Sequence, residues 1–432
     1  MTRFSKRVPM ILVNRMNTNP QITRGNGKDI ILQAFHWNLV KTRGTGTLHQ
    51  SPKSWYQILH DRSEEIAKSG FTILYLPPPW IDDSEWEGNG KHGGGEGYFW
   101  RDFDLNSRYG TKEELTSLIR KLHSLGLKAI VDIVLNHRDR FRMKNDVWTY
   151  PGPAWRVSGS DTGGAFFDGS CDLKLDRPEV YSRFKQALNE LTNDCGVDGW
   201  RWDFVWGYHP KDVMNLIKDT TAIEYFSVGE YWQAASIKDD PMFQRYGNNE
   251  RSRILGWAEE SGCAVFDMIL KKEINSANST NLKYGLNLSP NRKERELAVT
   301  LVDNHDTGAS PYSPSNGWGQ KVWECPSHFK SKAYCFVLTT PGTPCIYWPD
   351  YFDWGLTEIE DLALLRKKAG ITAGSEWEDL SSNYGGFAGI VSNEQGNPSL
   401  AVSIDSSFEG PGAGWTKALE KKGEWTVWIT NS

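Results

Sequence analysis

Three carboxylates in this chain each stand at the end of a short apolar segment. Asp203 ends Gly-Trp-Arg-Trp-Asp, Glu230 ends Val-Gly-Glu, and Asp306 ends Val-Asp-Asn-His-Asp. A lone acid in such a place is more simply a solvated loop residue. Three at equivalent positions, however, resemble what the hydrolysis of a glycosidic bond needs, because that reaction places two carboxyl groups around one bond.

The residues near these acids suggest how their roles divide. Arg201 lies two residues before Asp203, and His137 and His305 occupy similar positions after apolar runs. We expect Arg201 to hold Asp203 ionised, as an attacking group requires. A carboxyl group crowded by other acids and rings has a raised pKa and keeps the proton that the leaving oxygen must receive. The third acid could bind sugar hydroxyls and balance an oxocarbenium-like transition state.

Apolar runs alternate with segments of helical pattern between residues 29 and 370. Ser51 and Pro52 predict the N-cap and first residue of one helix, and Thr111 with Glu114 predicts a capping box for the next. The run at 127–135 is apolar at nearly every position, as in a parallel strand buried on both faces. The runs are Ile30–Leu32, Phe71–Leu76, Leu127–Leu135, Gly199–Phe204, Tyr225–Gly229, Cys263–Phe266, Ala298–Val302 and Pro344–Tyr347.

Eight strands with intervening helices predict an α/β fold, a (β/α)8 or TIM barrel, rather than an open doubly wound sheet. The glycine spacing at residues 88–93 resembles a dinucleotide fingerprint but opens no helix, so we set it aside. Active sites of such barrels lie at the C-terminal strand ends, which would bring the three acids to one rim. The expected organisation is an N-terminal extension (1–28), the barrel (29–136 and 177–370), an inserted subdomain after the third strand (137–176) and a small C-terminal antiparallel β domain (371–432).

Composition excludes some partners. With 49 basic and 54 acidic residues the net charge is −5, so we expect no nucleic acid, which a basic excess would attract. No stretch approaches the roughly 18 apolar residues of a membrane span, so we expect no membrane association. The first 20 residues lack the apolar core of a signal peptide, which favours a cytoplasmic protein, with a secreted mature form as the alternative. The six cysteines form no CxxC pair, and free thiols and disulfides both remain open.

Tryptophan is abundant, with 20 residues. Most such rings belong to a core, but flat amphipathic rings at a surface suit flat ligands such as sugar faces. Trp200 and Trp202 alternate with the charged residues of their run, so we expect them to face the helix layer. Trp86, Trp206 and Trp232 lie near strand ends on the side of the acids, and we expect them to contact sugar, with packing as the alternative for Trp206 and Trp232.

Four segments, in this order, resemble the motifs of the α-amylase superfamily of glycoside hydrolases. They are Asp132-Ile-Val-Leu-Asn-His137, Gly199-Trp-Arg-Trp-Asp203, Gly229-Glu230 and Val302-Asp-Asn-His-Asp306. The resemblance implies a retaining double displacement with Asp203 as nucleophile, Glu230 as acid/base and Asp306 as transition-state stabiliser. It also implies that the sugar at the cleavage point is bound by His137, Arg201 and His305 and stacks on Tyr98.

More closely, the chain is similar to bacterial maltooligosaccharide-forming amylases, especially the maltotetraose-forming type. The resemblance rests on the segments Ile31–Asn38, Gly93–Trp100, Asp203–Tyr208 and Asp353–Gly355. It implies a monomer that cleaves α-1,4-glucosidic bonds of starch, glycogen and maltooligosaccharides and releases short maltooligosaccharides. The alternatives are an α-1,6-glucosidase or transglycosylase of the same superfamily, or a non-catalytic glucan-binding scaffold. The scaffold is disfavoured because all three acids are present.

The same resemblance implies a structural Ca²⁺ between the barrel and the inserted subdomain. By position, its ligands would be the side chains of Asn136, Asp161 and Asp172 and the carbonyl of Gly207. Such hard oxygen donors suit this ion. One further acidic position of the family falls on Gly164, which implies fewer ligands or weaker binding. For Asp161 the alternative is a plain loop aspartate.

Overall fold

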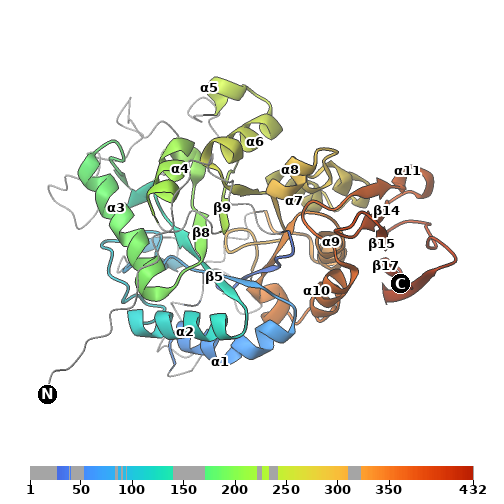
Figure 1. The fold of residues 1–432 in the computed structure, drawn as a ribbon, viewed down its shortest axis with the longest axis horizontal. Coiled ribbons are helices and arrows are strands. Elements are labelled where there is room, and N and C mark those ends of the chain that lie inside the picture. Colours follow the sequence, from blue (N-terminus) through green and yellow to red (C-terminus); the bar gives the residue numbers. More distant parts are fainter. Residues whose placement is uncertain are drawn as a thin grey trace, which may run out of the picture.

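The predicted barrel is confirmed in the computed structural model, which describes residues 27–37, 39, 53–82, 86–88, 91–93, 95–139, 171–220, 226–232, 242–309 and 323–431. Among these, eight parallel strands close in the order β1-β12-β11-β10-β9-β8-β5-β2 (Figure 1). Each contains or overlaps one of the apolar runs. The strands are β1 (Ile31–Gln33), β2 (Ile73–Leu76), β5 (Lys128–Ile133), β8 (Gly199–Trp202), β9 (Phe226–Gly229), β10 (Ala264–Phe266), β11 (Ala298–Leu301) and β12 (Thr343–Tyr347).

Two glycines allow close packing of β8 and β9, one against a neighbouring strand and the other against helix α6 (Glu250–Ser261). A Cβ on Gly199 would lie 1.9 Å from the carbonyl oxygen of Phe226 on β9, and one on Gly229 would lie 2.1 Å from the Trp257 ring. Trp200 and Trp202 are fully buried, as expected for side chains that pack beneath the helices. In the β5–β8 register Asp132 is paired with Arg201, so the polar residues of these strands meet at one level.

Helices surround the barrel and follow its strands (Figure 1). Thr111 and Glu114 form the predicted capping box of α2. The predicted start of α1 is wrong, because the N-cap is Ser54. Its hydroxyl accepts the backbone N–H of Gln57, and the Gln57 side-chain oxygen accepts the backbone N–H of Ser54. The helices are α1 (Trp55–Lys68), α2 (Lys112–Ser124), α3 (Pro178–Glu190), α4 (Pro210–Asp219), α5 (Phe243–Tyr246), α6 (Glu250–Ser261), α7 (Met268–Asn275), α8 (Arg292–Leu297), α9 (Ser327–Thr339), α10 (Glu358–Ala369) and α11 (Ser381–Tyr384).

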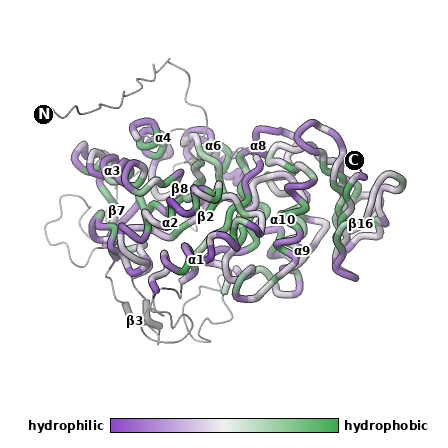
Figure 2. Tube along the Cα trace, turned by 60° about the horizontal axis from the view of Figure 1, so that its bottom comes forward, coloured by the Kyte–Doolittle hydropathy of each residue, from purple (hydrophilic) through white to green (hydrophobic). Residues whose placement is uncertain are grey.

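A five-stranded antiparallel sheet follows the barrel, in the order β13-β14-β15-β17-β16. It lies at the opposite end of the molecule from α3 (Figures 1 and 2). The rings of Phe336 on α9 and Phe387 on β14 are 4.8 Å apart, and the Trp425 indole donates to the Ser331 hydroxyl at 3.1 Å, so the sheet packs against the barrel. Its strands are β13 (Trp377–Asp379), β14 (Phe387–Ser392), β15 (Pro398–Ile404), β16 (Trp415–Lys421) and β17 (Trp425–Thr430).

Two small ribbons extend the barrel loops: β3 (Trp86–Gly88) pairs with β4 (Lys91–Gly93), and β6 (His137–Arg138) with β7 (Cys171–Asp172). The β6–β7 pair stands at the two ends of the segment predicted as an inserted subdomain, most of which lies outside the described residues, as does most of the N-terminal extension. Five described cysteines are buried free thiols, namely Cys195, Cys263, Cys325, Cys335 and Cys345.

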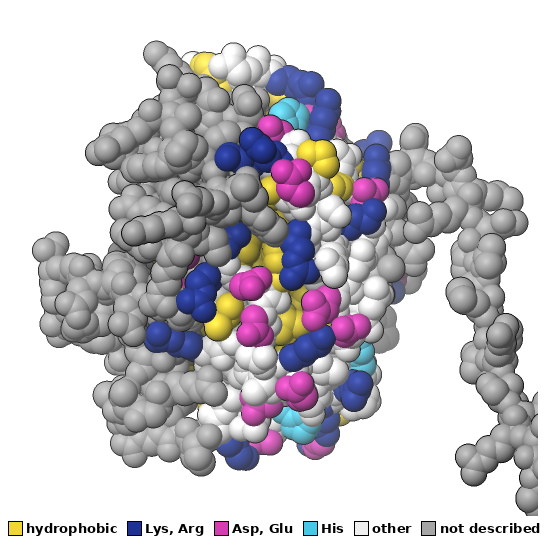
Figure 3. Space-filling view, turned by 90° about the vertical axis from the view of Figure 1, so that its left-hand side faces the viewer, with side chains coloured by type: hydrophobic (Ala, Val, Ile, Leu, Met, Phe, Trp, Pro, Cys, Tyr) yellow, Lys and Arg dark blue, Asp and Glu magenta, His cyan; other side chains and the backbone are white. Residues whose placement is uncertain are grey.

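The described surface has mixed charge. On the face shown in Figure 3, basic and acidic side chains are interspersed, in keeping with the small net charge of −5. Among the helices that the structure describes, none is both long and apolar enough to cross a membrane.

The cap of α2 provides a test of how this helix is stabilised. Thr111→Ala leaves the Glu114 N–H without its side-chain acceptor, so we expect the free energy of unfolding to fall by about 1 kcal/mol. Ser117→Ala, at an exposed site on the same helix, is the matched control. Urea unfolding followed by circular dichroism measures both, and equal effects would contradict the role of the cap.

Candidate active site

The three predicted catalytic acids meet at one end of the barrel. Asp203 directly follows β8, Glu230 directly follows β9, and Asp306 lies in the turn after β11. Their side chains are 10%, 5% and 24% exposed, so Asp306 is the most open to solvent. Parallel strands place their C-terminal ends on one rim, which is why residues distant in sequence share this site.

Arg201 joins the acids to one another. Its Nη1 lies 2.6 Å from Asp203 Oδ1 and 2.8 Å from Asp132 Oδ1, and its Nη2 lies 2.6 Å from Glu230 Oε1. Because the two nitrogens belong to one planar group, Asp203 and Glu230 are held side by side. The guanidinium is fully buried, so these ion pairs are poorly screened by water.

Asp132 ends the first motif segment and lies beneath the acids. Besides Arg201, it accepts hydrogen bonds from the Tyr75 and Tyr98 hydroxyls, at 2.6 and 2.7 Å from its Oδ2. The sequence signal for this anchoring role is an acid inside the otherwise apolar run at 127–135, and the role itself was not predicted. Asp132 anchors Arg201, and thereby positions Asp203 and Glu230.

The turn that carries Asp306 is braced from within. The Asn304 side-chain oxygen accepts the backbone N–H groups of Asp306 and Thr307, both at 3.0 Å. The Trp37 indole donates to Asp306 Oδ1 at 3.2 Å, and Asn304 Nδ2 lies 3.5 Å from Glu230 Oε1. These contacts fix the Asp306 carboxylate relative to the other acids.

A buried ionic cluster supports this turn from below. The fully buried Asp303 accepts from Lys271 on α7 at 2.7 Å and pairs with Lys330 on α9 at 3.0 Å. Lys330 also bonds to Asp350 at 2.8 Å, and Asp303 Oδ1 accepts from the Thr307 hydroxyl at 2.9 Å. Two lysines balance the two buried aspartates, and Glu324 lies 3.8 Å from Lys330 at the edge of the cluster. It ties the Asp306 turn to two outer helices.

Burial raises the pKa values of two of the three acids, Asp203 and Asp306. It raises the pKa of Asp306 to about 7, with the Glu230 charge adding to the effect and Arg201 opposing it. It also raises the pKa of Asp203 well above its usual range. Arg201 lowers the pKa of Asp203, in the direction that the sequence predicts, but burial has the larger effect. The guanidinium is also shared among three carboxyl groups.

The two histidines that we expect to bind sugar, His137 and His305, are neutral. Burial lowers the pKa of His137 to about 3 and that of His305 well below its usual value, with Arg201 adding to the second effect. His137 lies next to the ring of Phe204, at a centroid distance of 6.3 Å. The Tyr98 ring stacks on that of His305 at 5.3 Å, so these two predicted sugar-binding residues pack together.

Of the three tryptophans that we expect to contact sugar, the structure describes the side chains of two. Trp206 follows β8 and packs on Phe204 at 4.5 Å, and Trp232 follows β9 and packs on Trp323 at 6.0 Å. Both are half-buried and lie just beyond strands that carry an acid. Trp86 begins β3, but its side chain lies outside the described residues.

Two of the four predicted calcium ligands lie together beside the site. Asn136 and Asp172 are fully buried, and the Asn136 amide nitrogen lies 3.2 Å from Asp172 Oδ1. The Asn136 side-chain oxygen has no hydrogen-bond partner among the described residues, which suits an oxygen held ready for a cation. Gly207 ends the short 3-10 turn Val205–Gly207 after β8, and Asp161 lies outside the described residues.

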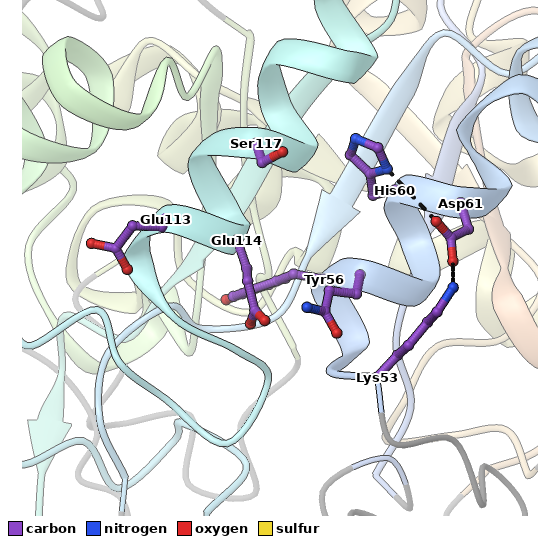
Figure 4. A pocket seen from close by; sticks show the side chains of 8 residues that line it. Lys53, Tyr56, His60, Asp61, Glu113, Glu114 and Ser117 are labelled. Carbon is purple, nitrogen blue, oxygen red and sulfur yellow. Dashed lines mark hydrogen bonds and ion pairs between the residues drawn. The ribbon is translucent and has the colours of Figure 1, made fainter.

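A separate hollow of about 550 Å³ lies between α1 and α2 (Figure 4). Lys53, His60, Asp61 and Glu113 line it, and a Lys53–Asp61 ion pair spans part of its wall. Its walls come from two outer helices rather than from strand ends. None of the predicted catalytic or sugar-binding residues lines it.

The chain matches the family model "Alpha amylase, catalytic domain" over residues 59–147. It is 35% identical to a glucan 1,4-alpha-maltotetraohydrolase of Roseateles saccharophilus over 98% of this chain and 77% of that protein. It is also 35% identical to the protein of that name from Stutzerimonas stutzeri, over 93% and 72%.

Solved structures agree on the fold. An Anoxybacillus alpha-amylase superposes with a TM-score of 0.65 at 17% identity, covering 95% of this chain and 99% of that one. An alpha-amylase from Geobacillus thermoleovorans gives 0.65 at 16% identity, covering 94% and 99%. At these identities the likeness speaks for the fold alone.

The raised pKa of Asp306 predicts a stabilising substitution. Its pKa rises from 3.8 when exposed to about 7 in the fold. The folded state therefore binds more protons in this window, so the Asp306 contribution to stability falls as the pH rises through it. We expect Asp306→Asn to stabilise the protein by roughly 2 kcal/mol at pH 8 and by little near pH 4.

Urea midpoints of the Asp306→Asn and parent proteins across this pH range test the prediction. Glu259→Gln, at an exposed position of α6, provides the matched control for loss of one surface charge. A stability difference that does not change with pH would show that Asp306 is not the source of the effect.

Proposed function

The chain belongs to the α-amylase family, and from this premise we propose that it hydrolyses α-1,4-glucosidic bonds of starch, glycogen and maltooligosaccharides and releases short maltooligosaccharides. The observation that carries the proposal is the group of Asp203, Glu230 and Asp306 at one rim, two of them bound to Arg201. The two maltotetraohydrolases cover most of this chain, which supports a short maltooligosaccharide product.

In the first step a carboxylate oxygen of Asp203 attacks the anomeric carbon and forms a glycosyl–enzyme bond. The glycosidic C–O bond breaks as Glu230 gives its proton to the leaving oxygen. Arg201 holds Asp203 and Glu230 side by side, and two neighbouring carboxyl groups do not readily ionise together, so one can be ionised while the other carries the proton.

In the second step a water molecule replaces the departed sugar. Glu230, now ionised, takes a proton from this water, and the oxygen attacks the anomeric carbon and releases Asp203. One water is consumed for each bond cleaved, and two displacements retain the anomeric configuration. Asp306 opposes the positive charge that develops on the sugar ring in both steps, which is why its position is braced from several sides.

The sugar at the cleavage point is bound, in this proposal, by His137, His305 and Arg201 and faces Tyr98. Neutral histidines fit this site, since they line it without adding charge beside the acids. Trp206 and Trp232 extend the track beyond the rim, and Trp86 is proposed to join them. Rings of this kind bind the flat faces of glucose units.

Removal of either central acid should abolish turnover. We expect Asp203→Asn and Glu230→Gln to lower the rate of reducing-sugar release from soluble starch by about a thousandfold or more. Glu259→Gln should keep the parent rate. Parent-like activity in either active-site variant would rule out the assigned roles.

The reaction products distinguish the proposed α-1,4 hydrolysis from the alternative activities of the same superfamily. Early chromatograms from maltoheptaose and pullulan should show short maltooligosaccharides from the former and little cleavage of α-1,6 bonds in the latter. Longer products would favour a transglycosylase, and pullulan debranching would favour an α-1,6-glucosidase.

We also propose a structural Ca²⁺ held by Asn136, Asp172, Asp161 and the Gly207 carbonyl. The ion would tie the loop after β5 to that after β8, and so stabilise the rim without taking part in bond cleavage. The proposal is supported by the buried, unpartnered side-chain oxygen of Asn136 and the fully buried Asp172 beside it.

Chelation tests the calcium proposal. Excess EGTA should lower the melting temperature, and added Ca²⁺ should restore it, because an ion that binds only the folded state stabilises it. Asp172→Asn should reduce the response to EGTA, whereas Asp139→Asn, at a nearby buried aspartate outside the proposed ligand set, should keep it. An unchanged melting curve in EGTA would remove the ion from the proposal.

A further inference from the structure

A continuous hydrogen-bond chain runs from β1 to the anchor of the acids. The Gln33 side-chain amide lies 2.7 Å from His305 Nδ1, and His305 Nε2 lies 2.8 Å from the Tyr98 hydroxyl. That hydroxyl donates to Asp132 Oδ2 at 2.7 Å. All four side chains are buried, so each link needs a defined donor and acceptor.

The direction of every link follows from the Asp132 end. Both carboxylate oxygens of Asp132 face Arg201 Nη1, at 2.8 and 2.9 Å, so this group acts as an acceptor. Tyr98 has one hydrogen and gives it to Asp132, so its oxygen must accept from His305 Nε2–H. A neutral ring with a proton on Nε2 has a bare Nδ1, which must accept, and the Gln33 amide NH₂ supplies that donor.

We propose that Gln33 is a positioning residue that holds His305 neutral with its single proton on Nε2. The inference rests on the proposed function, in which His305 contributes to the site. In this form the ring gives its one hydrogen to Tyr98 and adds no positive charge to the acids, although its Nε2 lies only 3.4 Å from Asp306 Oδ2. Gln33 therefore sets how much charge surrounds Asp306.

The other groups that face His305 agree with a neutral ring. The rings of Phe35, Trp37 and Tyr98 surround it at centroid distances of 5.0, 5.5 and 5.3 Å. The nearby Arg201 charge opposes a second proton. Asp306 is the one facing group among the described residues that favours the imidazolium, and Gln33 counters it by occupying Nδ1 with a donor.

Gln33→Glu inverts the link with almost no change in shape. A carboxylate at this position needs a hydrogen from Nδ1, while Tyr98 still needs one from Nε2, so we expect the ring to become an imidazolium at pH 7. Gln33→Met has a similar size but neither donates nor accepts. It removes the donor that opposes a proton on Nδ1, so we expect the ring to take up its second proton at a higher pH than in the parent. Gln57→Met, which removes a capping amide at the start of α1, is the control for loss of a glutamine far from the site.

Nitrogen-15 spectra of histidine-labelled protein report the protonation of each ring nitrogen, and the His305 signals are those lost in His305→Gln. At pH 7 we expect a protonated Nε2 and a bare Nδ1 in the parent and two protonated nitrogens in Gln33→Glu, and Gln33→Met should gain its second proton at a pH above that of the parent. Melting curves establish that each variant is folded. A protonated Nδ1 in the parent, or a neutral ring in Gln33→Glu, overturns the inference.

The pH dependence of kcat/KM supplies a second readout that packing alone would not change. An imidazolium beside Asp306 lowers the pKa values of the acids, so the acid limb for Gln33→Glu should move down by about one pH unit. Gln33→Met places no negative charge beside the ring and should move the limb by less, and identical profiles for the two variants would contradict the proposal. Because the spectra need no substrate, inactivity on starch with the predicted spectra would overturn only the proposed function.

Discussion

A single buried guanidinium governs the electrostatics of the barrel rim. Arg201 pairs with Asp132 beneath the site and with Asp203 and Glu230 at the rim, so it links these three carboxyl groups. Burial of a cation is tolerable because these partners surround it, and burial of the acids is tolerable because the cation is there. The balance is incomplete, since the acids outnumber the cation. Burial adds to this imbalance and raises the pKa of Asp306 to about 7.

The surrounding structure restricts the freedom of each acid by different means. Asp203 and Glu230 follow barrel strands directly, so the sheet itself places them. Asp306 lies in a turn and depends on other supports, namely the Asn304 side chain, the Trp37 indole and the ionic cluster around Asp303. The strands therefore place two acids, whose carboxyl groups Arg201 holds. The third is fixed by side-chain contacts, some within its own turn and some from distant segments.

The barrel and its three acids could be predicted from sequence because their signals are local. Runs apolar on nearly every residue mark strands buried on both faces, and each acid stands at the end of one. The start of α1 was misplaced because Ser-Pro and Ser54 with Gln57 offer competing caps three residues apart. Lys271, Lys330 and Gln33 could not be assigned from sequence, because their partners lie far along the chain. The raised pKa of Asp203 could not be predicted either, because its burial and the sharing of Arg201 are visible only in three dimensions.

The pairing of β1 with both β2 and β12 has a consequence for how the enzyme is made. β1, the first strand among the described residues, can complete its hydrogen bonding only when residues 343–347 have also left the ribosome. Gln33 on that strand reaches His305, more than 270 residues later. A nascent chain cut short before β12 can hold every acid and still lack a closed rim. Activity during synthesis should therefore appear abruptly and late, as a direct signal of ring closure.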